Sequence, residues 1–208
     1  MSAADFPFVD LTPDQRRRVL GSLREKYVRV ASCPAGLFRY PTGPDGLKAL
    51  GYPEDFLASL PESVAVSFCG VGNPFTLGPL VPGEAVVDIG CGAGVDALLA
   101  ARLVGPGGRV VGLDVVAEMA LRAREHARAT GVAQALFLVA GAENLPFPDQ
   151  RFEVALSNGA FNLVVDKGRA LAEVFRVLKP GGRFLLADEV LVGELPADLE
   201  SRLARWAR

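Results

Sequence analysis

The run Asp88-Ile89-Gly90-Cys91-Gly92-Ala93-Gly94 combines a carboxylate with glycines at alternate positions. Glycines spaced in this way leave room for a ligand to lie against the backbone, and they tolerate the positive φ of a tight turn. Asp88 is awkward beside a pyrophosphate, but its charge suits a ligand that carries an ammonium or sulfonium group. The residue types therefore predict a binding loop for a cationic cofactor.

The glycine spacing separates two kinds of cofactor. A dinucleotide fingerprint would place its third glycine at position 95, where this chain has Val95. With Asp88 just before the loop, the pattern favours S-adenosylmethionine, which is a sulfonium, over a nicotinamide dinucleotide. A nicotinamide-dependent oxidoreductase remains the weaker alternative. The alternative without a ligand is an ordinary tight turn.

Four further positions are candidates for the same cofactor. Asp114 follows the loop by about 20 residues, where an acidic side chain can accept both ribose hydroxyls; it could equally cap the next helix. Ala142 and Glu143 lie in the segment expected over the adenine, and Asn158 should face the methionine end.

The elements that must position these residues alternate regularly after position 84. Apolar runs bounded by glycine turns predict strands and helices in alternation, which indicates a parallel sheet with helices on both faces. The expected fold class is α/β, with a doubly wound, mostly parallel, Rossmann-like sheet. The expected strands are Ala85–Ile89, Arg109–Asp114, Ala135–Ala140, Phe152–Ser157 and Arg183–Asp188, and the expected helices are Val95–Val104, Ala117–Thr130 and Lys167–Lys179, the last ending before Pro180-Gly181-Gly182.

The first 80 residues differ in composition from the rest. A charged amphipathic helix is expected over Thr12–Val30, with Thr12 as its cap and Pro13 in its first turn. A Gly/Pro-rich cover follows, with short helices near Leu47 and Phe56. We therefore expect a helical cap over residues 1–80, acting as a lid or simply packing, and a cofactor-binding α/β domain over 81–208.

Composition excludes several classes of function. The 208 residues are 50% hydrophobic with a formal net charge of −2, so neither disorder nor a nucleic-acid partner is expected. The sequence has no apolar run near the roughly 20 residues that span a membrane and no signal-peptide pattern, which predicts a cytoplasmic protein. Three scattered cysteines and a single histidine, His126, make a disulfide framework and a zinc site improbable, and no metal is expected.

Three stretches carry a family resemblance: VVDIGCGAGVDALLAARLVGPGGRVVGLDVVAEM, AENLPFPDQRFEVALSNGAFNLV and VFRVLKPGGRFLLADEV. They resemble class I S-adenosylmethionine-dependent methyltransferases. Together with GVGNPFTLG they are most similar to the arsenite methyltransferase group, over roughly Ser67 to Arg208. The resemblance implies S-adenosylmethionine as cofactor, with its amino-acid part at Asp88, Gly90, Gly92 and Gly94, its ribose at Asp114, its adenine near Ala142 and Glu143, and its methionine end near Asn158.

The chain departs from this group at the thiols that would bind trivalent arsenic. The positions of two family cysteines fall on Val71 and Gly159, and a third would lie beyond Arg208. Soft-metal capture needs convergent sulfurs, so a different small acceptor is expected. The weak substrate candidates are Cys69, Asn162 and Asp166, although each of them suits a packing, turn or cap role.

No catalytic residue is assigned from the sequence, and His126 and Arg16-Arg17-Arg18 are expected on solvated helix faces. One more helical pattern, Ala197–Trp206, follows the last expected strand. The final strands of a class I sheet are therefore missing, which predicts a fragment or a split protein. Association through an open sheet edge, with itself or with another chain, would fit that arrangement. A protein that binds the cofactor without catalysis is the alternative to an active methyltransferase of small molecules.

Overall fold

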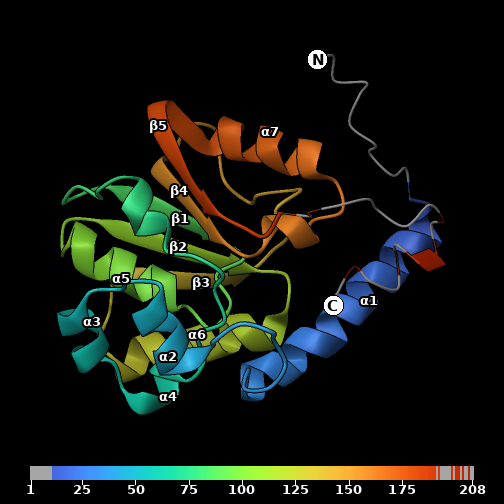
Figure 1. Ribbon diagram of the computed structural model, residues 1–208. Coiled ribbons are helices and arrows are strands. Elements are labelled where there is room, and N and C mark those ends of the chain that lie inside the picture. Colours follow the sequence, from blue (N-terminus) through green and yellow to red (C-terminus); the bar gives the residue numbers. More distant parts are fainter. Residues whose placement is uncertain are drawn as a thin grey trace.

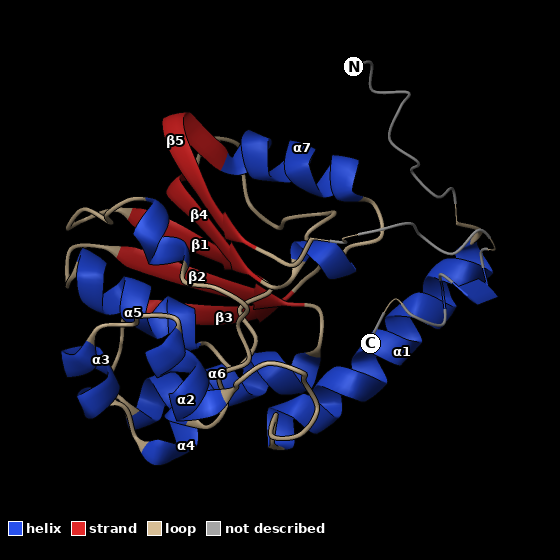
Figure 2. Cartoon of the chain, in the orientation of Figure 1, coloured by secondary structure: helices blue, strands red, loops and turns tan. Residues whose placement is uncertain are grey.

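The computed structural model describes residues 11–190, 192, 198, 200, 201, 203 and 206. Five parallel strands cross its centre in the order β3-β2-β1-β4-β5 (Figures 1 and 2). β1 pairs with both β2 and β4, so the strand order reverses between β1 and β4. Ligands of doubly wound sheets bind at such a switch point, beyond the carboxyl ends of the strands. The strands are β1 (Ala85–Ile89), β2 (Arg109–Asp114), β3 (Ala135–Val139), β4 (Phe152–Asn158) and β5 (Leu178–Ala187).

Helices cover both faces of the sheet, which confirms the predicted α/β fold class. α5 (Val95–Val104) and α6 (Ala117–Ala129) lie on one face and α7 (Lys167–Val177) on the other (Figure 2). Successive residues of β1 divide between the two cores: Val86 packs with α5, and Val87 packs with α7. This alternation follows from the period of two along a strand, and each such buried side chain contributes about 1.5–3 kcal/mol.

The first helix begins as the sequence predicts. α1 (Pro13–Ser32) opens with a capping box, in which the Gln15 backbone N–H donates to Thr12 Oγ1 and the Thr12 backbone N–H donates to Gln15 Oε1. Its C-terminal half packs on α6, where Val30 joins Ala93 and Met119 in a buried cluster. α1 therefore reaches the carboxyl end of the sheet, beside the glycine loop.

The Gly/Pro-rich cover forms α2 (Gly43–Ala49), α3 (Glu54–Ser59), α4 (Glu62–Ala65) and the short 3-10 helix η2 (Pro74–Leu77). The expected helices near Leu47 and Phe56 are thus present. Both side chains are buried in the same core as Val95 and Leu98 of α5. The cover and the sheet consequently share one continuous core. Among the described residues, no helix combines the length and the apolar character needed to cross a membrane.

The boundary between α7 and β5 differs from the prediction. The helix was expected to run to Lys179, but it ends at Val177, and the backbone of Leu178 is already extended. Leu178 pairs with Phe152 before regular pairing resumes at Arg183, so β5 starts earlier than Arg183 and carries an irregular turn. A further 3-10 helix, η3 (Phe161–Leu163), follows β4. The predicted helix Ala197–Trp206 lies largely outside the described residues.

Candidate functional site

The glycine loop joins β1 to α5 at the switch point of the sheet. The backbone N–H groups of Gly90 and Cys91 both donate to the Leu113 carbonyl at 2.8 Å, which ties the loop to β2. Gly94 caps α5 with φ +89°, and a Cβ there would lie 2.9 Å from the Ala123 Cβ. At Gly92, by contrast, a Cβ would meet nothing within 4 Å. The loop is therefore fixed at its flanks while its middle lies open to a ligand.

Asp114 at the end of β2 binds the loop and the following helix together. One carboxylate oxygen accepts the Gly92 backbone N–H at 2.9 Å, and the other accepts the Val116 backbone N–H at 2.8 Å. Val116 is the N-cap of α6, so Asp114 is not the helix cap that the sequence offered as its alternative role. Each carboxylate oxygen retains a lone pair for a further donor. Burial raises the pKa of Asp114 to about 6 against the two backbone hydrogen bonds, which lower it.

Two more buried carboxylates lie close to Asp114. Asp88 is fully buried, and its Oδ2 has no hydrogen-bond partner. Burial raises the pKa of Asp88 well above its usual value, and the charges of Asp96 and Asp114 raise it further. Among the described residues, no lysine or arginine forms an ion pair with any of the three. A cationic cofactor would supply the partner that this carboxylate oxygen lacks.

Sequence analysis missed Asp96. It lies in the first turn of α5 and is buried, with its pKa raised by burial against the hydrogen bonds from Tyr52 and Asn158, which lower it. Its signal was an acidic residue inside the mostly apolar run Val95–Val104. Such a residue either faces water or is paired within the core. The Tyr52 hydroxyl donates to Asp96 Oδ1 at 2.5 Å, and Asn158 Nδ2 donates to Asp96 Oδ2 at 2.9 Å.

Asn158, predicted to face the methionine end of the cofactor, binds the cover segment in this structure. Its Oδ1 accepts the backbone N–H groups of Val71 and Gly72 at 2.9 and 3.0 Å. Its Nδ2 donates to the Gly72 carbonyl at 2.8 Å as well as to Asp96. The amide thus forms a latch that holds the segment Gly70–Gly72 against the ends of β4 and β5. Its place in cofactor binding remains a prediction.

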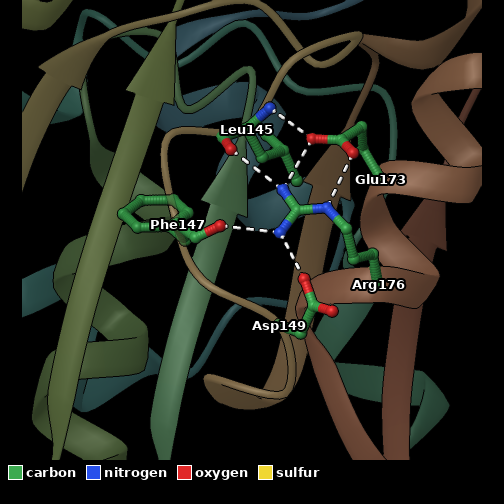
Figure 3. A network of polar contacts seen from close by, with 5 residues as sticks. All are labelled: Leu145, Phe147, Asp149, Glu173 and Arg176. Carbon is green, nitrogen blue, oxygen red and sulfur yellow. Dashed lines mark hydrogen bonds and ion pairs between the residues drawn. The ribbon is translucent and has the colours of Figure 1, made fainter.

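The segment predicted to cover the adenine is held from two sides. Glu143 Oε1 accepts the Asp166 backbone N–H at 2.9 Å and lies 4.0 Å from the Arg16 guanidinium. Farther along, Arg176 of α7 donates to the carbonyls of Leu145 and Phe147 at 3.0 and 2.7 Å (Figure 3). The same guanidinium pairs with Asp149 and Glu173, and Glu173 accepts the Leu145 N–H at 2.8 Å (Figure 3). The loop is therefore anchored before any ligand arrives, and Ala142 is half-buried on it.

The two positions without the family's cysteines are neighbours in space. Gly159 has φ +71°, and a Cβ there would lie 3.2 Å from Cγ1 of Val71. Cys69, two residues earlier, packs beside Ala93 and Val116. Burial raises the pKa of its thiol to about 12, so Cys69 is a thiol and not a thiolate at neutral pH. Val71, Gly159 and Cys69 consequently form an apolar surface in this part of the site.

The other weak substrate candidates have structural partners. The Asp166 carboxylate accepts the Arg169 backbone N–H at 2.9 Å and thereby caps α7. The Asn162 backbone N–H donates to Asp188 at 2.9 Å, and its side-chain amide donates to Glu189 at 3.3 Å. Asn162 Oδ1, however, is buried without a hydrogen-bond partner. Of the two, Asn162 is the one with a buried polar atom that lacks a partner.

Two expectations about solvated side chains need revision. His126 was expected on a solvated face, but it is 3% exposed, because this side of α6 packs on the glycine loop. Of the three arginines at the start of α1, Arg17 and Arg18 are exposed as expected. Arg16 is half-buried beside Glu143.

Comparison with known proteins gives a consistent result. A family model described as a methyltransferase domain matches residues 80–207. The arsenite methyltransferase of Halobacterium salinarum is 33% identical over 205 residues, covering 92% of this chain and 51% of that protein. The ubiquinone/menaquinone biosynthesis C-methyltransferase of Vibrio campbellii is 40% identical over 108 residues, covering 51% of this chain and 42% of the relative. The chain spans about half the length of the curated relatives it matches.

Solved structures agree with the sequence relatives. An arsenic (III) S-adenosylmethionine methyltransferase from Chlamydomonas reinhardtii superimposes with a TM-score of 0.59 at 34% identity, covering 72% of this chain and 50% of that one. The YcgJ protein of Bacillus subtilis has a TM-score of 0.51 at 36% identity, covering 55% and 47%.

Proposed function

The chain belongs to the class I S-adenosylmethionine-dependent methyltransferases, and from this premise we propose that its glycine loop binds that cofactor for methyl transfer to a small acceptor. The observation that carries the proposal is the unpartnered Asp88 Oδ2 beside an open loop at Gly92. A cation bound there would compensate three buried carboxylates that lack ion pairs. A dinucleotide would instead bring its phosphates against them.

The residues fit the cofactor in distinct roles. Asp88 near the end of β1 and Asp96 in the first turn of α5 would face the positive charges of the cofactor. Asp114 retains lone pairs for the ribose hydroxyls, and Ala142 and Glu143 lie on the anchored loop proposed for the adenine. When bound, S-adenosylmethionine supplies a methyl group on a sulfonium, a good leaving group. The contribution of the protein is then mainly positioning, which can supply about 7–11 kcal/mol.

Apart from the carboxylates proposed to hold the cofactor, the titratable side chains around the site favour an acceptor that needs no base. Burial raises the pKa of both Tyr27 and Tyr40 well above the usual range, and it raises that of the Cys69 thiol to about 12. At neutral pH none of these groups is ionised, so none accepts a proton readily. We therefore propose an acceptor whose nucleophilic atom arrives with a free electron pair.

Val71 and Gly159 support an acceptor other than thiolate-bound arsenite. They are in contact, and neither contributes a sulfur atom. The paired variant Val71→Cys/Gly159→Cys should bind phenylarsine oxide at least tenfold more tightly than the wild type. The matched control is Val71→Ser/Gly159→Ser, which introduces the same backbone strain without thiols. Equal binding by wild type and the cysteine pair would contradict the inference that the missing thiols at these two positions decide arsenic binding.

Calorimetric titration of the full chain with S-adenosylmethionine and S-adenosylhomocysteine tests the cofactor proposal. Micromolar binding is expected for the wild type, and Asp88→Asn and Gly92→Val should weaken it at least tenfold. Asp45→Asn, which changes an exposed carboxylate outside the site, should bind as the wild type does. Absence of binding by folded wild type, or binding indifferent to both site variants, would overturn the proposal.

A second candidate is a cofactor-binding protein that needs a partner chain for turnover. It is favoured by the edge position of β5 in the described sheet, since unpaired edges tend to acquire strands. Formation of S-adenosylhomocysteine is measured with arsenite, quinols and phenols as acceptors. Turnover by the chain alone supports the first candidate, whereas cofactor binding without turnover of any acceptor supports the second.

A further inference from the structure

The side chain of His126 on α6 contacts the glycine loop. It is 3% exposed, and its Nδ1 lies 2.8 Å from the Ala93 carbonyl oxygen. Its Nε2 is buried without any hydrogen-bond partner. A buried imidazole with one ring nitrogen on the loop and the other unpaired is an unusual use of the only histidine in the chain.

The contact fixes one peptide plane of the loop. Ala93 lies between Gly92 and Gly94, whose φ angles are +52° and +89°. The Ala93 carbonyl bonds to His126, while the N–H of the same peptide group, on Gly94, donates to the Cys91 carbonyl at 2.8 Å. Because a peptide group is planar, these two bonds determine its orientation. Gly94 on one side of this peptide group would otherwise leave it freer to rotate.

The ionisation state of His126 follows from its surroundings. Donation to a carbonyl requires the proton on Nδ1, and a second proton would create a buried Nε2–H with no acceptor. Burial lowers the pKa of His126, the hydrogen bond to Ala93 raises it, Arg122 lowers it and Glu125 raises it. From the glycine loop His126 faces the Ala93 carbonyl, and both charged groups lie on α6. The net lowering keeps the ring neutral at pH 7.

We infer that His126 is a positioning residue that presets the Ala93–Gly94 peptide for the cofactor. It acts together with Asp114, which holds the Gly92 N–H from the end of β2. A loop held in its binding conformation avoids the entropy that ordering would cost on binding. The inference rests on the proposal that this loop binds S-adenosylmethionine, and its test separates the two.

The test compares His126→Asn with His126→Leu in the full chain. Asparagine can place its Nδ2 donor close to the position of Nδ1, whereas leucine fills the space without a donor. His126→Leu should weaken S-adenosylhomocysteine binding about five- to tenfold, the factor expected for one hydrogen bond. His126→Asn should stay within about twofold of the wild type. Amide hydrogen exchange at Gly94 in the free protein should accelerate in the leucine variant alone.

A stability control distinguishes positioning from packing. Val104→Ala removes buried volume at the far end of α5 and should lower the melting temperature without changing cofactor affinity. Wild type that fails to bind S-adenosylhomocysteine would overturn the proposed function, while the exchange rates at Gly94 would still report on the loop. Wild type that binds, with both His126 variants equal to each other in affinity and exchange, would overturn the positioning role.

Discussion

The side-chain amide of Asn158 pairs with the backbone of Gly72 in both directions. Oδ1 accepts the Gly72 N–H at 3.0 Å, and Nδ2 donates to the Gly72 carbonyl at 2.8 Å. A residue at the end of β4 thereby holds the cover segment by the same two bonds that one strand forms with another. Because Nδ2 also reaches Asp96, the latch joins the cover, the sheet and the first turn of α5.

Replacing Asn158 by aspartate should destabilise the protein in a pH-dependent way. The Asn158→Asp variant replaces a donor with a carboxylate oxygen beside Asp96 Oδ2, where two like charges would lie buried together. We expect the free energy of unfolding to fall by about 2–4 kcal/mol at pH 8, as it does when other buried networks are broken. Stability should recover as pH falls, because the raised pKa of the pair makes the folded state bind a proton more tightly than the unfolded chain.

Urea unfolding at pH 8 and pH 5.5 measures this effect. Asn158→Ala is the matched control, since it loses the hydrogen bonds without adding a charge. A pH dependence of equal size in both variants would contradict the electrostatic explanation.

Cofactor affinity should fall as the solution is acidified through pH 6. The pKa of Asp114 is raised to about 6 in the free protein by burial, and hydrogen bonds from the ribose hydroxyls would favour its ionised form. Binding therefore requires release of a proton below pH 6, and affinity should fall up to tenfold per pH unit there. Calorimetry at pH 5.0, 6.0 and 7.5 measures the profile.

The same carboxyl group should affect folding with the opposite sign. Its pKa of about 6 in the folded state exceeds the roughly 3.9 of an unfolded aspartate, so acidification from pH 7 to 5 increases its contribution to stability. Asp114→Asn should reduce the pH dependence both of cofactor affinity and of stability. An unchanged slope of affinity in this variant would assign the titration to Asp88 or Asp96 instead.

The contact between Gly159 and Val71 should appear as an energetic coupling. Gly159→Ala introduces a side chain at φ +71° and places its Cβ 3.2 Å from Val71 Cγ1. We expect the free energy of unfolding to fall by about 1–3 kcal/mol. Val71→Ala, which creates space, should reduce that loss when the two changes are combined. A double-mutant cycle by chemical denaturation measures the coupling, and strict additivity would show that the strain comes from the backbone alone.

Arg176→Lys should loosen the loop proposed for the adenine. The guanidinium serves two carbonyls and two carboxylates, and an ammonium cannot reproduce this planar set of donors (Figure 3). We expect a loss of about 1–2 kcal/mol in unfolding free energy and faster hydrogen exchange at Leu145. Arg122→Lys is the control: its hydrogen bond and ion pair are with Glu125, one turn away, so its loss should stay below about 0.5 kcal/mol.

The parts of the fold that sequence could predict are those dictated by local patterns. β1, β2 and α5 have the predicted boundaries, because each of these short apolar runs begins or ends at a glycine turn. The loop with Asp88 and Asp114 was found for the same reason, since its spacing is readable within 27 residues. The start of β5 was missed, because Leu178 continues the helical apolar pattern and only its pairing with Phe152 makes it a strand.

The contacts that could not be predicted from the sequence join residues that are far apart along the chain. Asn158 was singled out, but its bonds to Val71 and Gly72 cross 87 and 86 positions of sequence and leave no local trace. His126 was misplaced because its neighbours in sequence are charged, while its partner is a carbonyl 33 residues away. Asp96 was overlooked because its partners come from the cover and from β4.

The latch at Asn158 also has a consequence for the order in which the chain can fold. The cover leaves the ribosome before any strand of the sheet, with Leu47, Tyr52 and Phe68 destined for the shared core. Their partners on β4, and the amide that holds Gly72, are synthesised more than 80 residues later. Contacts of such high sequence separation form slowly, because loop closure comes first. We therefore expect the bonds between Asn158 and Gly72 to form late in folding, after β4 has been synthesised.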